Sequence, residues 1–66
     1  MELEEVLEKV RDFLKKAGHT FPKIYEVKQV GNSWKVKAEL GWGKFARIKV
    51  DDKTGKVVEF YEETTT

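Results

Sequence analysis

The first part of the chain carries apolar residues at steps of three and four, the spacing of one face of an α-helix. These residues are Leu3, Val6, Leu7, Val10, Phe13, Leu14 and Ala17. Glutamates come first and lysines last, which favours a helix because each charge then complements the helix dipole. Gly18 follows and can take the left-handed conformation that ends a helix. We therefore expect one amphipathic helix over residues 2–17.

After Gly18 apolar and polar positions alternate, which is typical of half-buried β-strands. Four such segments lie at about residues 22–30, 33–40, 44–51 and 56–63. Tight turn sequences separate them, namely Gly31-Asn32, Gly41-Trp42-Gly43 and Asp52-Lys53-Thr54-Gly55. The pattern predicts an α+β fold in which one N-terminal helix packs on a four-stranded antiparallel meander, order 1-2-3-4.

The turns also predict which side chains share a face of the sheet. They favour the closing pairs Val30–Ser33, Leu40–Lys44 and Asp52–Lys56. The resulting register places a set of apolar residues on one face, namely Tyr25, Val27, Trp34, Val36, Ala38, Leu40, Ala46, Ile48, Val50, Val58 and Phe60. We expect the helix to cover this face and to come closest at Ala38 and Ala46, whereas Ile24 and Val57 fall on the open face.

Length and composition limit the possible classes of protein. A chain of 66 residues forms one domain, residues 1–66, and buries too little surface for stability unless packing is regular or chains associate. It has no Cys and one His, which excludes disulfides and a multi-histidine metal site. Charged residues make up 38% of the chain, yet the net charge is +1, which argues against a dedicated polyanion binder.

The location and origin follow from the same composition. No apolar run approaches the roughly 20 residues of a membrane span, and the acidic start does not resemble a signal peptide. We expect a soluble protein, cytoplasmic if it is natural. Abundant Lys and Glu, few amides and no Cys suit a thermophilic or computationally designed sequence.

Two candidate chemical motifs have simpler explanations. Residues 41–46 match G-x-G-x-x-A, but dinucleotide binding needs a helix after the glycines, and residues 45–51 alternate as a strand. We interpret this segment as a hairpin turn. His19 has Thr20 as its nearest hydroxyl and no evident second partner, so we interpret it as a connector residue. We therefore expect no enzyme activity, cofactor or metal.

The open face of the predicted sheet is the candidate binding surface. Its register sets Lys35 opposite Lys49 and Lys37 opposite Arg47, with Phe45 and Tyr61 nearby, a combination that could hold nucleic acid. The competing explanation is structural. Five cations face five carboxylates, including Glu26 opposite Lys37 and Glu59 opposite Lys49, so cross-strand ion pairs account for the face without a ligand.

Trp42 lies in the loop between two glycines and cannot easily reach the covered core. It either folds over the sheet edge or stands exposed as an anchor for a partner, since Trp is enriched at binding hot spots. Together with Phe45 it could also form the apolar patch of a homodimer.

From Trp34 to Glu62 the chain resembles PepSY-like domains. The resemblance lies in residues 48–58, where a strand, Asp51-Asp52, Thr54-Gly55 and a second strand follow one another. The helix and meander are also similar to cystatins in outline, although the cystatin loop sequence Q-V-V-A-G is not present. The resemblance implies a small non-catalytic regulatory or binding module and transfers no binding residue.

The sequence therefore favours a non-enzymatic structural or interaction module, a monomer or weak homodimer. The alternative is nucleic-acid or anion binding through the open face, at Lys35, Lys37, Arg47, Lys49, Phe45, Tyr61 and Trp42.

Overall fold

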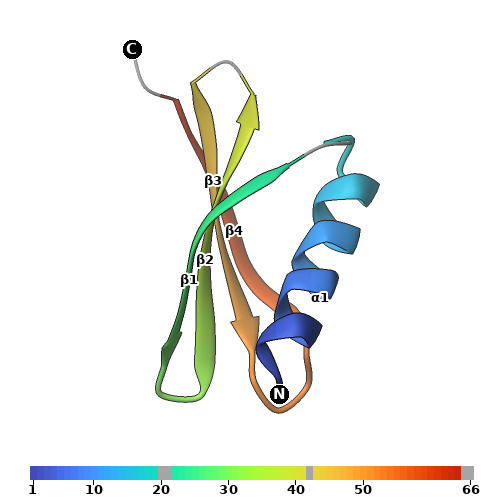
Figure 1. The fold of residues 1–66 in the computed structure, drawn as a ribbon, viewed down its shortest axis with the longest axis vertical. Coiled ribbons are helices and arrows are strands. Elements are labelled where there is room, and N and C mark those ends of the chain that lie inside the picture. The colour runs from blue at the N-terminus through green and yellow to red at the C-terminus, as the bar shows by residue number, and fades with distance from the viewer. Residues whose placement is uncertain (20–21, 42, 65–66) are drawn as a thin grey trace.

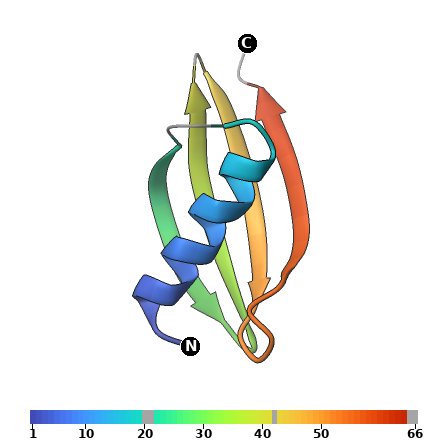
Figure 2. The same ribbon diagram turned by 90° about the vertical axis from the view of Figure 1, so that its right-hand side faces the viewer.

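The computed structural model describes residues 1–19, 22–41 and 43–64. One helix precedes four strands, with the bounds α1 (Leu3–Lys16), β1 (Lys23–Val30), β2 (Ser33–Gly41), β3 (Lys44–Asp51) and β4 (Val57–Thr64). The strands form one antiparallel sheet in the order β1-β2-β3-β4, and α1 lies obliquely across one of its faces (Figures 1 and 2). The predicted α+β meander is thus confirmed, with each element within about two residues of its expected bounds.

Both ends of α1 follow the expected physical signals. The backbone N–H of Glu2 donates to a carboxylate oxygen of Glu5 at 3.4 Å, as in a capping box. At the other end Gly18 takes φ +97°, and the N–H of His19 donates to the carbonyl of Leu14 at 2.8 Å. The left-handed glycine therefore ends the helix as predicted.

The core lies between α1 and the two central strands. Its fully buried side chains are Val6, Val10, Leu14, Val36, Ala38, Ala46, Ile48 and Val50. Phe13 meets Phe60 edge to face, with ring centroids 5.1 Å apart. Leu3 and Ala17, at the two ends of the helical stripe, are exposed, so the buried part of the helix is shorter than its apolar stripe.

The predicted register is confirmed along the middle of the central strands, from Trp34 to Ala38 on β2, and is wrong at one position of β1. Val27 pairs with Val36 and Val30 with Ser33 as expected, but a bulge follows, and Ile24 instead of Tyr25 stands opposite Ala38. Ile24 packs against the core, and Tyr25 is 52% exposed. A bulge adds one residue to a strand and so exchanges the faces on which later side chains lie.

The β3–β4 hairpin differs from the prediction for a related reason. The N–H of Asp51 donates to the carbonyl of Lys56 at 2.9 Å, so the turn closes at Asp51 instead of Asp52. Val57 then pairs with Val50 and packs against the core, while Val58 occupies a bulge and is 58% exposed. The prediction that Val58 faces the core and Val57 faces outward was therefore wrong.

The β2–β3 hairpin also contains an irregularity, because Gly41 pairs with Lys44, so the predicted closing pair Leu40–Lys44 was wrong. Leu40 nevertheless packs against the core as expected. Beyond this point the predicted pairs Ala38–Ala46, Val36–Ile48 and Trp34–Val50 are all present.

Candidate functional site on the open face of the sheet

α1 covers one face of the sheet, and no helix of the described residues covers the other, which we call the open face (Figure 1). Alternation along the strands, corrected for the bulges, gives its charged and aromatic residues. They are Lys23, Tyr25, Glu26, Lys28, Lys35, Lys37, Glu39, Phe45, Arg47, Lys49, Asp51, Glu59, Tyr61 and Glu63. The structure thus adds Tyr25 and Lys23 to the predicted set and removes Ile24 and Val57.

Five cations lie together on β1, β2 and β3 of the open face, and we call them the basic cluster: Lys28, Lys35, Lys37, Arg47 and Lys49. Lys35 stands opposite Lys28 on one side and Lys49 on the other, and Lys37 stands opposite Arg47. Opposite residues on neighbouring strands place their Cβ atoms only about 4.5–5.5 Å apart. The cluster, together with Glu26, Glu59 and Tyr61, lines a hollow of about 220 Å³.

The carboxylates around the basic cluster neutralise it only in part. Arg47 forms an ion pair with Glu63 at 2.8 Å, and Lys28 a longer one with Glu26 at 3.8 Å. Within the described residues, none of the other three lysines, Lys35, Lys37 and Lys49, has a carboxylate oxygen within 4.0 Å.

The two cross-strand ion pairs expected from the sequence therefore have the predicted register but not the predicted contact. Glu26 is the pairing partner of Lys37, and Glu59 that of Lys49. In the described part of the chain neither pair brings its charged atoms within ion-pair distance. The structural explanation of the open face consequently applies to Arg47 and Lys28 and leaves the remaining lysines unexplained.

Aromatic side chains adjoin the basic cluster at one end. The rings of Tyr25 and Phe45 lie 5.8 Å apart, with the ammonium of Lys37 5.3 Å from the Phe45 ring and that of Lys23 5.4 Å from the Tyr25 ring. The Tyr25 hydroxyl donates to Glu39 at 3.0 Å, and this hydrogen bond to a carboxylate raises the pKa of Tyr25. Sequence alternation missed Tyr25 because the bulge moves it to this face.

Tyr61 lies on the other side of the basic cluster. It pairs with Arg47, lines the hollow and is 46% exposed. Its predicted place on the open face is thus confirmed. Trp42, the last predicted residue of the binding face, lies outside the described residues.

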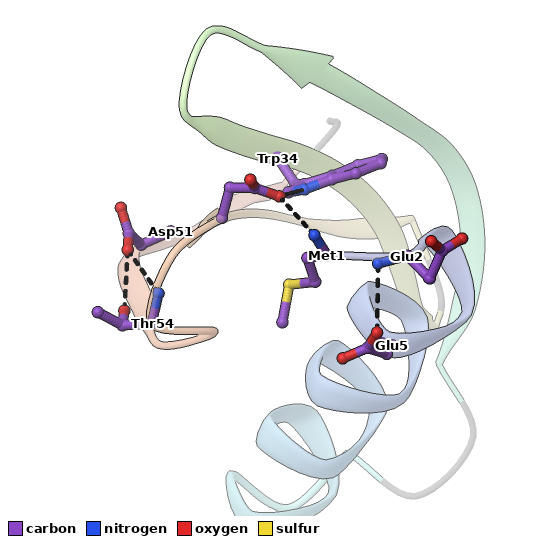
Figure 3. A network of polar contacts seen from close by, with 7 residues as sticks. Met1, Glu2, Glu5, Trp34, Asp51 and Thr54 are labelled. Atoms are coloured by element: carbon purple, nitrogen blue, oxygen red, sulfur yellow. Dashed lines mark hydrogen bonds and ion pairs between the residues drawn. The ribbon is translucent and has the colours of Figure 1, made fainter.

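Other polar contacts of the molecule serve the fold. At the β3–β4 turn the indole N–H of Trp34 donates to Asp52 at 2.7 Å, and the N-terminal ammonium of Met1 lies 3.4 Å from the same carboxylate (Figure 3). Asp51 accepts hydrogen bonds from the backbone N–H and the hydroxyl of Thr54, each at 2.9 Å. The two hydrogen bonds from Thr54 lower the pKa of Asp51. The hydrogen bond from Trp34 is the main cause of the lowered pKa of Asp52. Both carboxylates therefore hold the turn in place.

Across residues 1–19, 22–41 and 43–64, no three His, Asp or Glu side chains come together as metal ligands would, and no helix is long and apolar enough to cross a membrane. His19 lies 3.4 Å from Glu62, which ties the segment after α1 to β4, in keeping with a connector role.

Comparison with known proteins adds no relative: no protein-family model matches the chain, and neither the curated proteins nor the solved structures contain a significant match. The resemblance to PepSY-like and cystatin-like modules therefore stays a prediction. The fold and the site define the chain as a small α+β domain with an uncovered basic and aromatic sheet face.

Proposed function

We propose that this domain is a non-enzymatic interaction module and that it binds an anionic partner on its open face. The observation that carries the proposal is the row Lys28, Lys35 and Lys49, three cations opposite one another on three adjacent strands. Like charges in such positions destabilise a sheet. A bound anion would remove this repulsion, whereas the lysine row itself contributes no stability to the fold.

The competing proposal, a purely structural face, has less support. It requires the outer strands to neutralise the inner ones, and this happens at Arg47 but at none of the lysines of the two central strands within the described residues. The face also exposes Tyr25 and Tyr61 beside the cations. Exposed aromatic side chains next to unpaired cations are typical of binding surfaces.

Amide chemical-shift mapping tests the proposal. The protein would be titrated with pyrophosphate, polyglutamate and oligothymidylate, with polylysine as a control of opposite charge. We expect at least one anionic probe to shift amides of β2 and β3 around Lys35 and Lys49, while the outer face of α1 stays unchanged. No localised shift with any anionic probe, or equal shifts from polylysine, would contradict the proposal.

The remaining expectations stand as proposals beside this one. The resemblance to PepSY-like and cystatin-like modules, which comes from the sequence, supports a regulatory or binding role. Composition supports a heat-adapted or designed origin, and the cytoplasm if the source is natural.

The oligomeric state that we propose is a monomer or weak homodimer. Bulges in both edge strands support it, because they hinder sheet-to-sheet pairing between copies. An unchanged melting temperature over an about hundredfold dilution would indicate a monomer, since association makes that temperature depend on concentration.

A further inference from the structure

The cations of the open face form a strip that runs across the strands. Lys28, Lys35 and Lys49 stand opposite one another on β1, β2 and β3, with Lys37 and Arg47 in the neighbouring row. The strip therefore extends over about two strand spacings, roughly 10 Å, and ends at Glu59 on β4. A single polyanionic strand fits along this strip, while a wider double helix would also bring phosphates over the flanking carboxylates Glu26, Glu39 and Glu63.

Aromatic rings stand at the two ends of the strip. Glu26, Lys37, Arg47 and Tyr61 form one row across the four strands, and Tyr25 adjoins this row at its β1 end. The two tyrosines are therefore separated by about three strand spacings, roughly 14 Å. Both are about half exposed, so a ligand can reach part of each side chain.

We infer that the partner of the open face is single-stranded nucleic acid, which runs across the strands with its phosphates on the basic cluster and its bases on Tyr25 and Tyr61. This inference rests on the proposed function and names its ligand. Proteins that bind single strands without sequence preference combine a cationic groove with stacking aromatics, because every base has a π-face. An acidic peptide would use the cations but would leave the tyrosines without a role.

The near-neutral net charge does not oppose this inference, because the charge is unevenly distributed. Phosphate contacts depend on the local field around the strip, and the ammonium groups of Lys35 and Lys49 there lack carboxylates within 4.0 Å in the described part of the chain. The remaining acidic groups keep the affinity modest, and the phosphate contacts of the lysines make it strongly dependent on salt.

Fluorescence anisotropy with labelled oligothymidylate and oligouridylate tests the inference. We expect binding at ~50 mM salt that falls steeply toward ~200 mM, as counterion release requires. Lys49→Gln should weaken binding and lower the slope of log K against log salt by about 0.7, the value of one single-strand phosphate contact. The matched control Lys15→Gln, an exposed helical lysine, should leave both unchanged.

The stacking contribution is tested separately. Tyr61→Ala should weaken binding roughly tenfold with an unchanged salt slope, whereas Tyr61→Phe, which keeps the ring, should bind like the original protein. Thermal melting of each variant confirms that it is folded. Equal loss in both Tyr61 variants would contradict stacking, since the hydroxyl would then be the binding group.

The outcomes separate this inference from the proposed function. Absence of oligonucleotide binding at low salt, combined with localised shifts from pyrophosphate or polyglutamate, would overturn the nucleic-acid inference and leave the interaction module intact. Absence of shifts with every anionic probe would overturn both. Equal effects of Lys49→Gln and Lys15→Gln, or equal affinity for duplex DNA, would also contradict a single-strand site on the open face.

Discussion

On the central strands β2 and β3, apolar and polar side chains alternate without interruption from Trp34 to Ala38 and from Ala46 to Val50, whereas each edge strand contains a bulge that exchanges the two faces. The central strands are held by a neighbour on each side and by α1 above. An edge strand is paired on one side, so a bulge there disrupts one ladder instead of two.

This difference between central and edge strands determines which side chains of each strand enter the core and which lie on the surface. At the centre, small and branched side chains on the helix side are fully buried, and the charged side chains point away. At the edges the bulges select Ile24 over Tyr25 and Val57 over Val58 for the core. For β1 the selection has a physical reason, because the Tyr25 hydroxyl would need a buried partner in the core and finds Glu39 on the open face.

The largest expected change in the free energy of unfolding is for a buried residue of the central strands. Ile48→Ala removes a side chain that is 2% exposed and leaves a cavity under α1, so we expect the free energy of unfolding to fall by about 2–5 kcal/mol. Denaturant unfolding followed by circular dichroism measures this change. Val30→Ala, on the edge strand β1 at 45% exposure, is the matched control and should change stability by no more than about 0.5 kcal/mol.

The edge strands provide a direct test of the bulge in β4. Val57→Ala should lower the free energy of unfolding by about 1–2 kcal/mol, because Val57 packs against the core, while Val58→Ala should cost no more than about 0.5 kcal/mol. The same unfolding measurement compares the two variants. If Val58→Ala proved the more costly, the uninterrupted register predicted from alternation would be right and the bulge wrong.

These residues also show how far the sequence predicts the molecule. Period and turn signals predicted the helix, the four strands and the central pairs, because burial on one face permits one register there. The bulges could not be predicted from alternation, since Ile24 and Tyr25 are both acceptable strand residues, as are Val57 and Val58. The basic cluster was predicted, but Tyr25 beside Phe45 was not.

A smaller effect is expected on the open face, with the opposite sign. Lys35→Glu would place a carboxylate between Lys28 and Lys49, which replaces two like-charge contacts with two opposite-charge ones. We expect a gain of about 0.5–1 kcal/mol in the free energy of unfolding at low salt, decreasing as salt is added. Lys15→Glu carries the same charge change on α1 and should not stabilise the protein. A loss of stability in Lys35→Glu would mean that Lys35 has a structural role.

The smallest effect near neutral pH concerns the β3–β4 turn. The pKa values of Asp51 and Asp52 are lowered from the ordinary value of 3.8, because Thr54 donates to the first and the indole of Trp34 to the second. As the pH falls, Asp51 and Asp52 therefore become protonated in the unfolded chain before they do so in the folded protein. Stability is fully present above about pH 4 and decreases as the pH falls through the lowered pKa values.

Melting temperatures measured from about pH 6 down to about pH 2 follow this loss. We expect Asp51→Asn to reduce the decrease, because Asn does not titrate and its side-chain oxygen still accepts a hydrogen bond from Thr54. Glu59→Gln, which removes an exposed carboxylate without a hydrogen bond or ion pair among the described residues, is the matched control and should leave the decrease unchanged. An effect of Glu59→Gln equal to that of Asp51→Asn would locate the acid sensitivity on the open face and would mean that Glu59 neutralises Lys49 after all.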